Sequence, residues 1–120
     1  MKKQEVEQFE AILELYADVI KHHNDFYVAR FAELGYVSIQ YIRKNGLIEQ
    51  GYVHRTPREL YRFLEEGWEE GWIYDYADEI GMKDMDYDVF AANLPKEKKD
   101  ELWQLHKRYQ EKAEAILETE

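Results

Sequence analysis

The sequence predicts a single all-α domain, a compact bundle of four to five helices that spans residues 1–120. Apolar residues recur at three- and four-residue spacing along most of the chain, as they do on the buried face of a helix. Helix start and stop signals divide that pattern into segments. With 120 residues, 45% of them hydrophobic, the chain can close one core but not two.

The first helix is expected over residues 4–22, where an apolar stripe begins at Val6 and Phe9. A second is expected from Phe26 to the stop signal Asn45-Gly46. The same stretch also carries a strand pattern, because apolar and polar residues alternate after Val37 and Asn-Gly favours hairpin turns. The helix is preferred, and a minor hairpin over residues 36–55 is kept as the alternative.

The clearest helix start is Thr56-Pro57-Arg58-Glu59. Threonine suits the N-cap, proline the first helical position and glutamate the third, so a helix begins at Pro57. Its apolar stripe shifts around the helix after Gly67, which predicts two helices, 57–66 and 68–80, with Gly81 ending the second. A short turn of helix is expected over 88–92, and a long final helix after Pro95.

Composition excludes several kinds of function. The chain has no cysteine, so it has no disulfide, thiolate metal site or cysteine nucleophile. It shows no signal-peptide or membrane-span pattern, so we expect a cytoplasmic protein. The net charge of −10 disfavours nucleic acid and anionic membranes as partners. No phosphate loop or catalytic triad is visible, so we expect no cofactor and lean against an enzyme.

Residues 65–88 hold ten acidic residues, one lysine and five tryptophan or tyrosine residues. The regular four-residue spacing of Trp68, Trp72 and Tyr76 indicates core positions, whereas Tyr74 points to the opposite face. Aromatic rings among acidic groups are typical of a surface that binds a basic protein. The predicted function is therefore a small non-enzymatic interaction or regulatory protein, for example an inhibitor that mimics nucleic acid. The candidate partner-binding residues are Glu70, Tyr74, Asp75, Asp78, Asp84, Asp86 and Tyr87.

A mildly basic stretch, residues 21–62, suggests a first alternative. The segment from Ala32 to Arg43, followed by Asn45-Gly46-Leu47-Ile48, resembles the helix-turn-helix of MerR-like regulators. In such a motif Gly35 would make the turn and a recognition helix would follow. The resemblance implies a DNA-binding regulator with the contact residues Ser38, Gln40, Arg43, Lys44, Arg55 and Arg58.

A second alternative comes from two groups of carboxylates, Glu-Glu-x-x-Glu and, further on, Glu-x-x-Asp. They resemble the magnesium-binding carboxylates of the all-helical, MazG-like nucleotide pyrophosphohydrolases. The resemblance implies a magnesium-dependent enzyme whose metal ligands are Glu65, Glu66, Glu69, Glu97 and Asp100.

Overall fold

The computed structural model describes residues 2–18, 26–31, 35–41, 45, 47–82 and 84–118. Within these ranges the chain forms four helices and one three-stranded antiparallel sheet. The protein is therefore mostly helical rather than all-α. In chain order the elements are α1 (Lys3–Leu15), β1 (Phe26–Phe31), β2 (Gly35–Tyr41), β3 (Ile48–His54), α3 (Pro57–Glu79), α4 (Tyr87–Ala92) and α5 (Lys96–Leu117).

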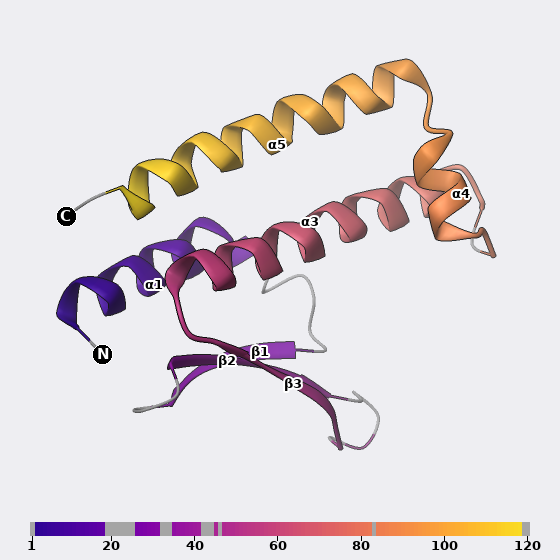
Figure 1. Cartoon of the computed structure of the whole chain (residues 1–120). Coiled ribbons are helices and arrows are strands. Elements are labelled where there is room, and N and C mark those ends of the chain that lie inside the picture. The colour runs from indigo at the N-terminus through magenta and orange to yellow at the C-terminus, as the bar shows by residue number, and fades with distance from the viewer. Residues whose placement is uncertain are drawn as a thin grey trace.

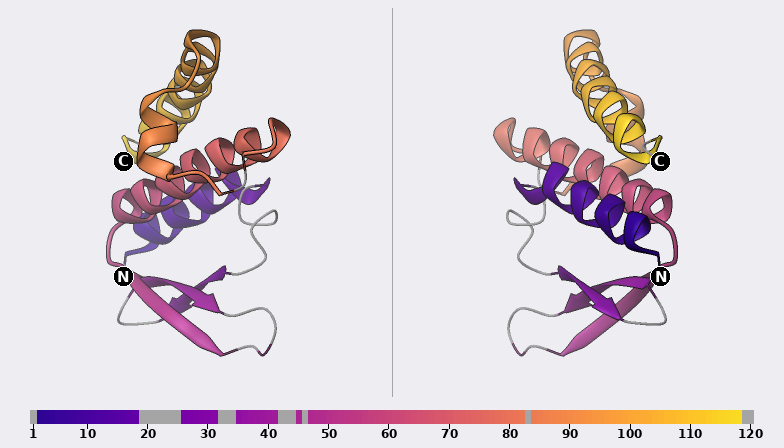
Figure 2. Two further views of the ribbon diagram at one scale, coloured as in Figure 1. Left: turned by 90° about the vertical axis from the view of Figure 1, so that its right-hand side faces the viewer. Right: turned by 90° about the vertical axis from the view of Figure 1, so that its left-hand side faces the viewer.

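The described elements form two layers (Figure 1). The sheet, with strand order β1-β2-β3, makes one layer, and all the helices lie on one side of it. α1 and α3 lie nearest the sheet and α5 packs beyond them, while α4 stands at the far end of α3 (Figures 1 and 2). Within the described ranges, no helix has the length and apolar character needed to cross a membrane.

The helix preferred for residues 26–45 is wrong, and the hairpin alternative is confirmed where the chain is described. β2 and β3 pair antiparallel, with Val37 opposite Val53, and β1 adds a third strand along β2. Tyr36 and Ser38 of β2 are buried against the helices. Val37 and Ile39 alternate with them on the other face, so apolar residues stand on both faces of the strand. When both faces carry apolar residues, some of these residues also fall three or four positions apart, as on one face of a helix. Periodicity alone therefore favoured a helix.

The core lies between the three long helices and the inner face of the sheet. Phe9 and Ile12 of α1 and Tyr16, which follows its last residue, are completely buried, together with Leu60 of α3. The ring of Tyr36 stacks on that of Phe9, with centroids 4.2 Å apart and planes within 9°, and so joins the sheet to α1. The remaining members of this cluster of buried residues are Tyr61, Leu64, Trp68 and Ala113.

The start of α3 follows the sequence signal. The Thr56 hydroxyl accepts a hydrogen bond from the Glu59 backbone N–H at 3.2 Å, and Pro57 occupies the first turn. The Glu59 carboxylate accepts from the N–H of Arg55 at 2.7 Å, one residue before the position that a capping box uses. The predicted start of α3 is therefore confirmed, but the Glu59 carboxylate bonds to the N–H of Arg55 instead of that of Thr56.

The predicted break at Gly67 is wrong, because α3 is one helix of 23 residues. Leu60 and Leu64 in its first half pack with α1, whereas Trp68 meets Tyr109 of α5, with ring centroids 5.1 Å apart. The apolar stripe shifts along one continuous helix because α1 lies beside only the first part of α3, whereas α5 runs along both halves. Gly81, with φ of +75°, ends the helix as expected, and the next residue donates to the carbonyl oxygen of Ala77 at 2.8 Å.

The final helix and the short helix before it are also confirmed. α4 covers 87–92 and α5 begins directly after Pro95. The first turn of α3 is joined to the last part of α5 by Arg58, whose guanidinium donates to both carboxylate oxygens of Glu114 at 2.8 and 3.0 Å. These contacts hold the start of α3 beside the last part of α5.

Candidate functional site

The candidate partner-binding residues lie on the second half of α3 and on the segment that leads into α4. Tyr74 projects from α3 next to the buried Ile73 and is 50% exposed. Its ring lies 5.3 Å from that of Tyr87, the first residue of α4, with the planes tilted by 31°. Two aromatic rings from different helices therefore meet at the surface. We call Tyr74, Tyr87, Glu69, Glu70, Asp78 and Asp88 the acidic aromatic face.

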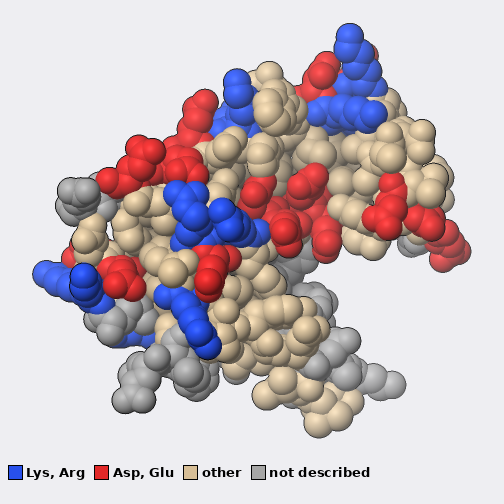
Figure 3. Space-filling view, in the orientation of Figure 1, with Lys and Arg blue, Asp and Glu red and all other residues tan. Residues whose placement is uncertain are grey.

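Acidic groups surround this ring pair. Burial raises the pKa of Tyr87 to about 12, and the charges of Glu70 and Glu69, followed by those of Tyr74 and Asp88, add to the effect. Negative charges raise the pKa of a phenol because they disfavour its anion. Burial is the main cause of the raised pKa, and the three nearby carboxylates add to it. In Figure 3 acidic side chains lie over the middle of α3 and over α4, and others lie at the opposite end of the molecule, over the last part of α5 and near α1.

The other predicted partner-binding residues lie around this face but differ in what they do. Asp75, Asp78 and Asp84 are exposed. Asp86 has a structural role, since its carboxylate caps α4 by accepting from the Val89 N–H at 3.2 Å. The structure therefore brings Glu70, Tyr74 and Tyr87 together directly.

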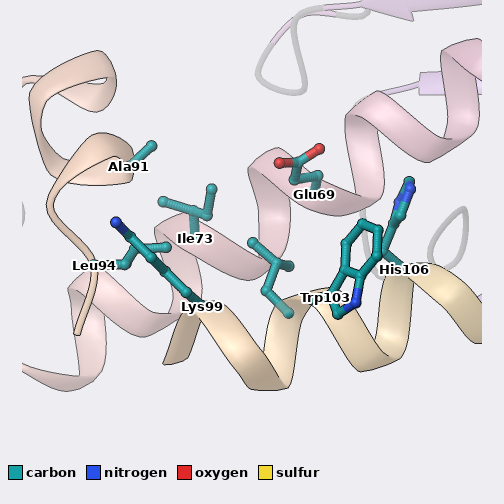
Figure 4. A pocket seen from close by; sticks show the side chains of 8 residues that line it. Glu69, Ile73, Ala91, Leu94, Lys99, Trp103 and His106 are labelled. Carbon is teal, nitrogen blue, oxygen red and sulfur yellow. The ribbon is translucent and has the colours of Figure 1, made fainter. Parts of the chain in front are cut away.

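A cleft of about 370 Å³ opens beside the acidic aromatic face, between α3, α4 and α5 (Figure 4). Ile73 and Leu94 on its wall are buried, whereas Trp103 is 55% exposed. Figure 4 shows Trp103 beside His106 at one end of the cleft, and Ala91 and Leu94 at the other. Its remaining wall residues are Glu69, Lys99 and Leu102. The cleft is mainly apolar and adjoins the acidic aromatic face through Glu69.

At one end of the cleft a carboxylate and an imidazole meet. Nδ1 of His106 contacts Oε1 of Glu65, and the imidazole stacks on Trp103, with ring centroids 5.9 Å apart. Burial raises the pKa of Glu65, as do Glu69 and Glu66, while His106 lowers it. The pair links α3 to α5 and adds a polar group at the wall of the cleft.

The carboxylates of the magnesium alternative are not brought together. α3 and α5 run antiparallel, so Glu65 faces His106, whereas the start of α5 lies beside the end of α3, where Lys98 sits over the ring of Tyr76. Asp100 and Glu97 come six and nine residues before His106, so they lie about two turns of α5 away from the residue that faces Glu65. Among the described residues, which include all five proposed ligands, no three His, Asp or Glu side chains gather closely enough to hold a metal ion.

The residues of the DNA-binding alternative do not form a recognition helix. Residues 35–41 are strand β2, so the helix-turn-helix interpretation is wrong for this described segment. Ser38 is buried in the middle of the strand, Arg55 is exposed before α3, and Arg58 is held by Glu114. Arg43, Lys44 and the side chain of Gln40 lie outside the described residues.

A polar pair that no sequence pattern predicted lies under the helices. The Ser38 hydroxyl and Nε2 of His54 share a hydrogen bond of 2.7 Å, and both side chains are almost fully buried. Burial lowers the pKa of His54, and the nearby charge of Glu59 opposes that effect. Phe63 covers the imidazole at a ring distance of 4.9 Å. A group closed off in this way joins β2 to β3 and is not placed to meet a substrate.

The exposed Trp103 could have been found from the sequence. Leu102, Leu105 and Tyr109 follow helical spacing along α5, and Trp103 falls one residue outside that stripe. A helix turns by 100° per residue, so this position faces away from the core. The Glu65–His106 pair had no such signal, because it depends on the alignment of two helices far apart in the chain.

No protein-family model, no curated protein and no solved structure matches this chain, so its function has to be inferred from the geometry of its own residues.

Proposed function

We propose that this protein is a non-enzymatic interaction or regulatory protein that binds a basic protein partner through the acidic aromatic face. The observation that supports this most directly is the surface pair of Tyr74 and Tyr87 within the field of Glu69, Glu70 and Asp88. Charge alone attracts a partner from a distance but contributes little to lasting contact in water. Exposed tyrosine rings supply the contact area that holds a partner in place.

The chemistry of the face favours arginine on the partner. A guanidinium can stack on a tyrosine ring while its N–H groups pair with nearby carboxylates. Tyr74 and Tyr87 supply the rings, and Glu70 supplies a carboxylate beside them. Within α3, Glu70, Tyr74 and Asp78 follow at four-residue intervals and therefore share one line along the helix. An arginine-rich segment lying along this line would meet ring and charge alternately.

The first experiment identifies the partner by comparing the proteins that the wild type and its variants capture. Tagged wild-type chain, the variant Tyr74→Ala and the double variant Glu70→Lys/Asp78→Lys are used in parallel to capture proteins from the cell of origin, with nuclease present. The control is Asp18→Lys/Glu111→Lys, which makes the same charge change at two exposed positions outside α3 and α4. A specific partner is retained by the wild type and the control and is lost from both test variants.

Kinetic measurements with that partner then distinguish the effect of surface charge on association from the effect of the Tyr74 ring on dissociation. Glu70→Lys/Asp78→Lys should slow association roughly tenfold at low salt, because it removes electrostatic steering. Tyr74→Ala should mainly speed dissociation, also about tenfold, because a desolvated ring contact is lost. If every captured protein binds the test variants as well as it binds the wild type, the acidic aromatic face is not the binding surface.

A further inference from the structure

The cleft between α3, α4 and α5 is continuous with the acidic aromatic face. On α3, Ile73 lines the cleft and Tyr74, the next residue, belongs to the face, while Glu69 belongs to both. On α4, Tyr87 belongs to the face and Ala91, one turn later, lines the cleft. Both helices therefore pass from one surface to the other within a single turn, so one partner segment can reach both.

The walls of the cleft are apolar, and its volume suits one large side chain. Ile73 and Leu94 form buried parts of the wall, and Trp103 adds an indole at its exposed edge. The volume of about 370 Å³ lies near the lower end of the roughly 300 to 1,000 Å³ found for ligand pockets, so it accommodates one side chain rather than a longer segment. An apolar surface rimmed by charged residues is typical of a place where another molecule binds.

The charges around the cleft indicate that this side chain is uncharged. The exposed Lys99 stands at the end near Leu94, and it makes no ion pair within the described residues (Figure 4). At the other end the Lys107 amino group lies 6.0 Å from the centroid of the Trp103 ring, so the indole already has a cation over it. Both lysines disfavour a basic group inside the cleft, and the carboxylate of Glu69 disfavours an acidic one.

The acidic aromatic face beside the cleft selects for the opposite chemistry. In the part of the chain that the structure describes, no lysine or arginine lies over the ring of Tyr74 or Tyr87, whereas Lys98 lies over that of Tyr76 at 5.1 Å. Glu70 makes no ion pair within the same ranges. These rings and this carboxylate are thus open to basic groups of a partner. A partner that fits both surfaces has basic side chains for the face and an apolar side chain for the cleft.

We propose that the cleft binds a large apolar side chain of the basic partner, next to the arginine that the acidic aromatic face binds. This inference rests on the proposed function, and it defines the partner's binding segment as an arginine and a bulky aliphatic or aromatic residue close together. Tyr87 and Ala91 are one turn apart on α4, a rise of about 6 Å. Residues four apart in a helix, or two apart in a strand, have nearly this separation. The two partner residues are therefore expected at one of these spacings.

Selection from a library of short random peptides displayed on phage tests this chemistry without a known partner. Peptides selected at low salt by the immobilised full chain should contain arginine together with leucine, isoleucine, phenylalanine or tryptophan, at one of the two spacings. Peptides selected by Glu70→Lys/Asp78→Lys should lose the arginine, because the charge of the face is reversed. Peptides selected by Ala91→Phe, whose added ring occupies the cleft, should keep the arginine and lose the apolar residue.

The affinity of one selected peptide then locates the contact. Ala91→Phe should weaken binding at least about tenfold, whereas Ala92→Phe, the same substitution at the next, exposed position of α4, should leave it unchanged. Replacing the apolar residue of the peptide by alanine should weaken binding to the wild type similarly. It should have little further effect on Ala91→Phe, because the two changes remove the same contact. Trp103→Ala changes the exposed edge of the cleft and should also weaken binding, and circular dichroism checks that each variant is folded.

The possible results distinguish this inference from the proposed function. Peptides that contain arginine but no recurring apolar residue would overturn the inference and leave the proposed function standing. Peptides that contain an apolar residue but no arginine would overturn both, because the partner would not be basic. Equal weakening by Ala91→Phe and Ala92→Phe, or a selection that yields no binding peptide, would overturn the inference. So would binding of N-acetyl-phenylalaninamide as tight as that of the peptide, because the cleft would then be a site for a small molecule.

Discussion

Two buried tyrosines differ in what their hydroxyl groups meet. The Tyr36 hydroxyl donates to the Glu10 carboxylate at 2.6 Å. The Tyr16 hydroxyl is buried and has no hydrogen-bond partner among the described residues. Its ring stacks on Tyr109 with centroids 4.9 Å apart, so the ring itself is well packed. Burial accordingly raises the pKa of Tyr16, with no bond to offset the effect.

Replacing each tyrosine by phenylalanine should therefore change stability in opposite directions. Tyr16→Phe removes an unpaired buried hydroxyl and should raise the free energy of unfolding by about 1 kcal/mol. Tyr36→Phe removes a hydrogen bond to a charged group and should lower that free energy by roughly 1 to 2 kcal/mol. Urea unfolding of both variants beside the wild type measures the two changes. A loss of stability in Tyr16→Phe would mean that its hydroxyl has a partner after all.

For single residues, the sequence predicted exposure to solvent better than it predicted contacts with residues of other helices. Tyr74 was expected on the surface from its place in the helical repeat, and it lies there. Glu65 was expected beside other carboxylates, but in the structure it meets His106. Helical spacing determines which side of its own helix a residue occupies. Which residue of another helix it faces depends on how the two helices align, and no local pattern encodes that alignment.

Among the helices and strands, the predictions that depend on local sequence are also the ones that the structure confirms. Thr56-Pro57, Gly81 and Pro95 act through their own backbone, so the helix ends that they predict are confirmed. The strands over 26–54 depend on pairing between segments, and a helix was preferred there. The shift in the apolar stripe at Gly67 has a similar origin, because it records a change of neighbour along α3. Distant contacts thus account for both errors.

Gly67 provides a test at the level of this element. It lies inside a continuous helix, and a Cβ there would meet no atom within 4 Å apart from its own helix. Gly67→Ala should raise the free energy of unfolding by about 0.5 to 1 kcal/mol, since alanine has the higher helix propensity. Thermal and urea unfolding would show the increase. A lower stability would indicate that α3 bends at Gly67 in solution.

Over the whole molecule the acidic residues are separated from the sheet. The strands β2 and β3 contribute one acidic residue, Glu49, whereas the segment from 63 to 118 carries sixteen. The helical layer therefore holds most of the net charge of −10. Mutual repulsion within that layer disfavours the compact state. Under the proposed function, folding and partner binding make opposite demands on these charges, because the same charges would attract a basic partner.

This repulsion predicts how stability responds to salt. The melting temperature should rise between about 0.01 and 1 M NaCl, as the screening length falls from roughly 30 to 3 Å. The rise should be smaller for Asp18→Lys/Glu111→Lys, which carries less net charge. Both proteins have the same sheet, so the difference between them isolates the charge effect. If the melting temperature rises equally in both proteins, salt stabilises the fold by an effect other than screening of this repulsion.

The contact between α1 and α5 also affects the order in which the protein can mature on the ribosome. The Gln8 side chain donates to the backbone oxygens of Ile116 and Leu117, at 3.3 Å each, across a separation of more than one hundred residues. At roughly 5 to 20 residues per second, α1 is made about 5 to 20 seconds before its partner. During that interval Tyr16 lacks the Tyr109 ring that stacks on it, whereas the Tyr36 ring that stacks on Phe9 is already made. Native packing of α1 is therefore complete only after α5 has left the exit tunnel, although its contacts with β2 and α3 can form earlier.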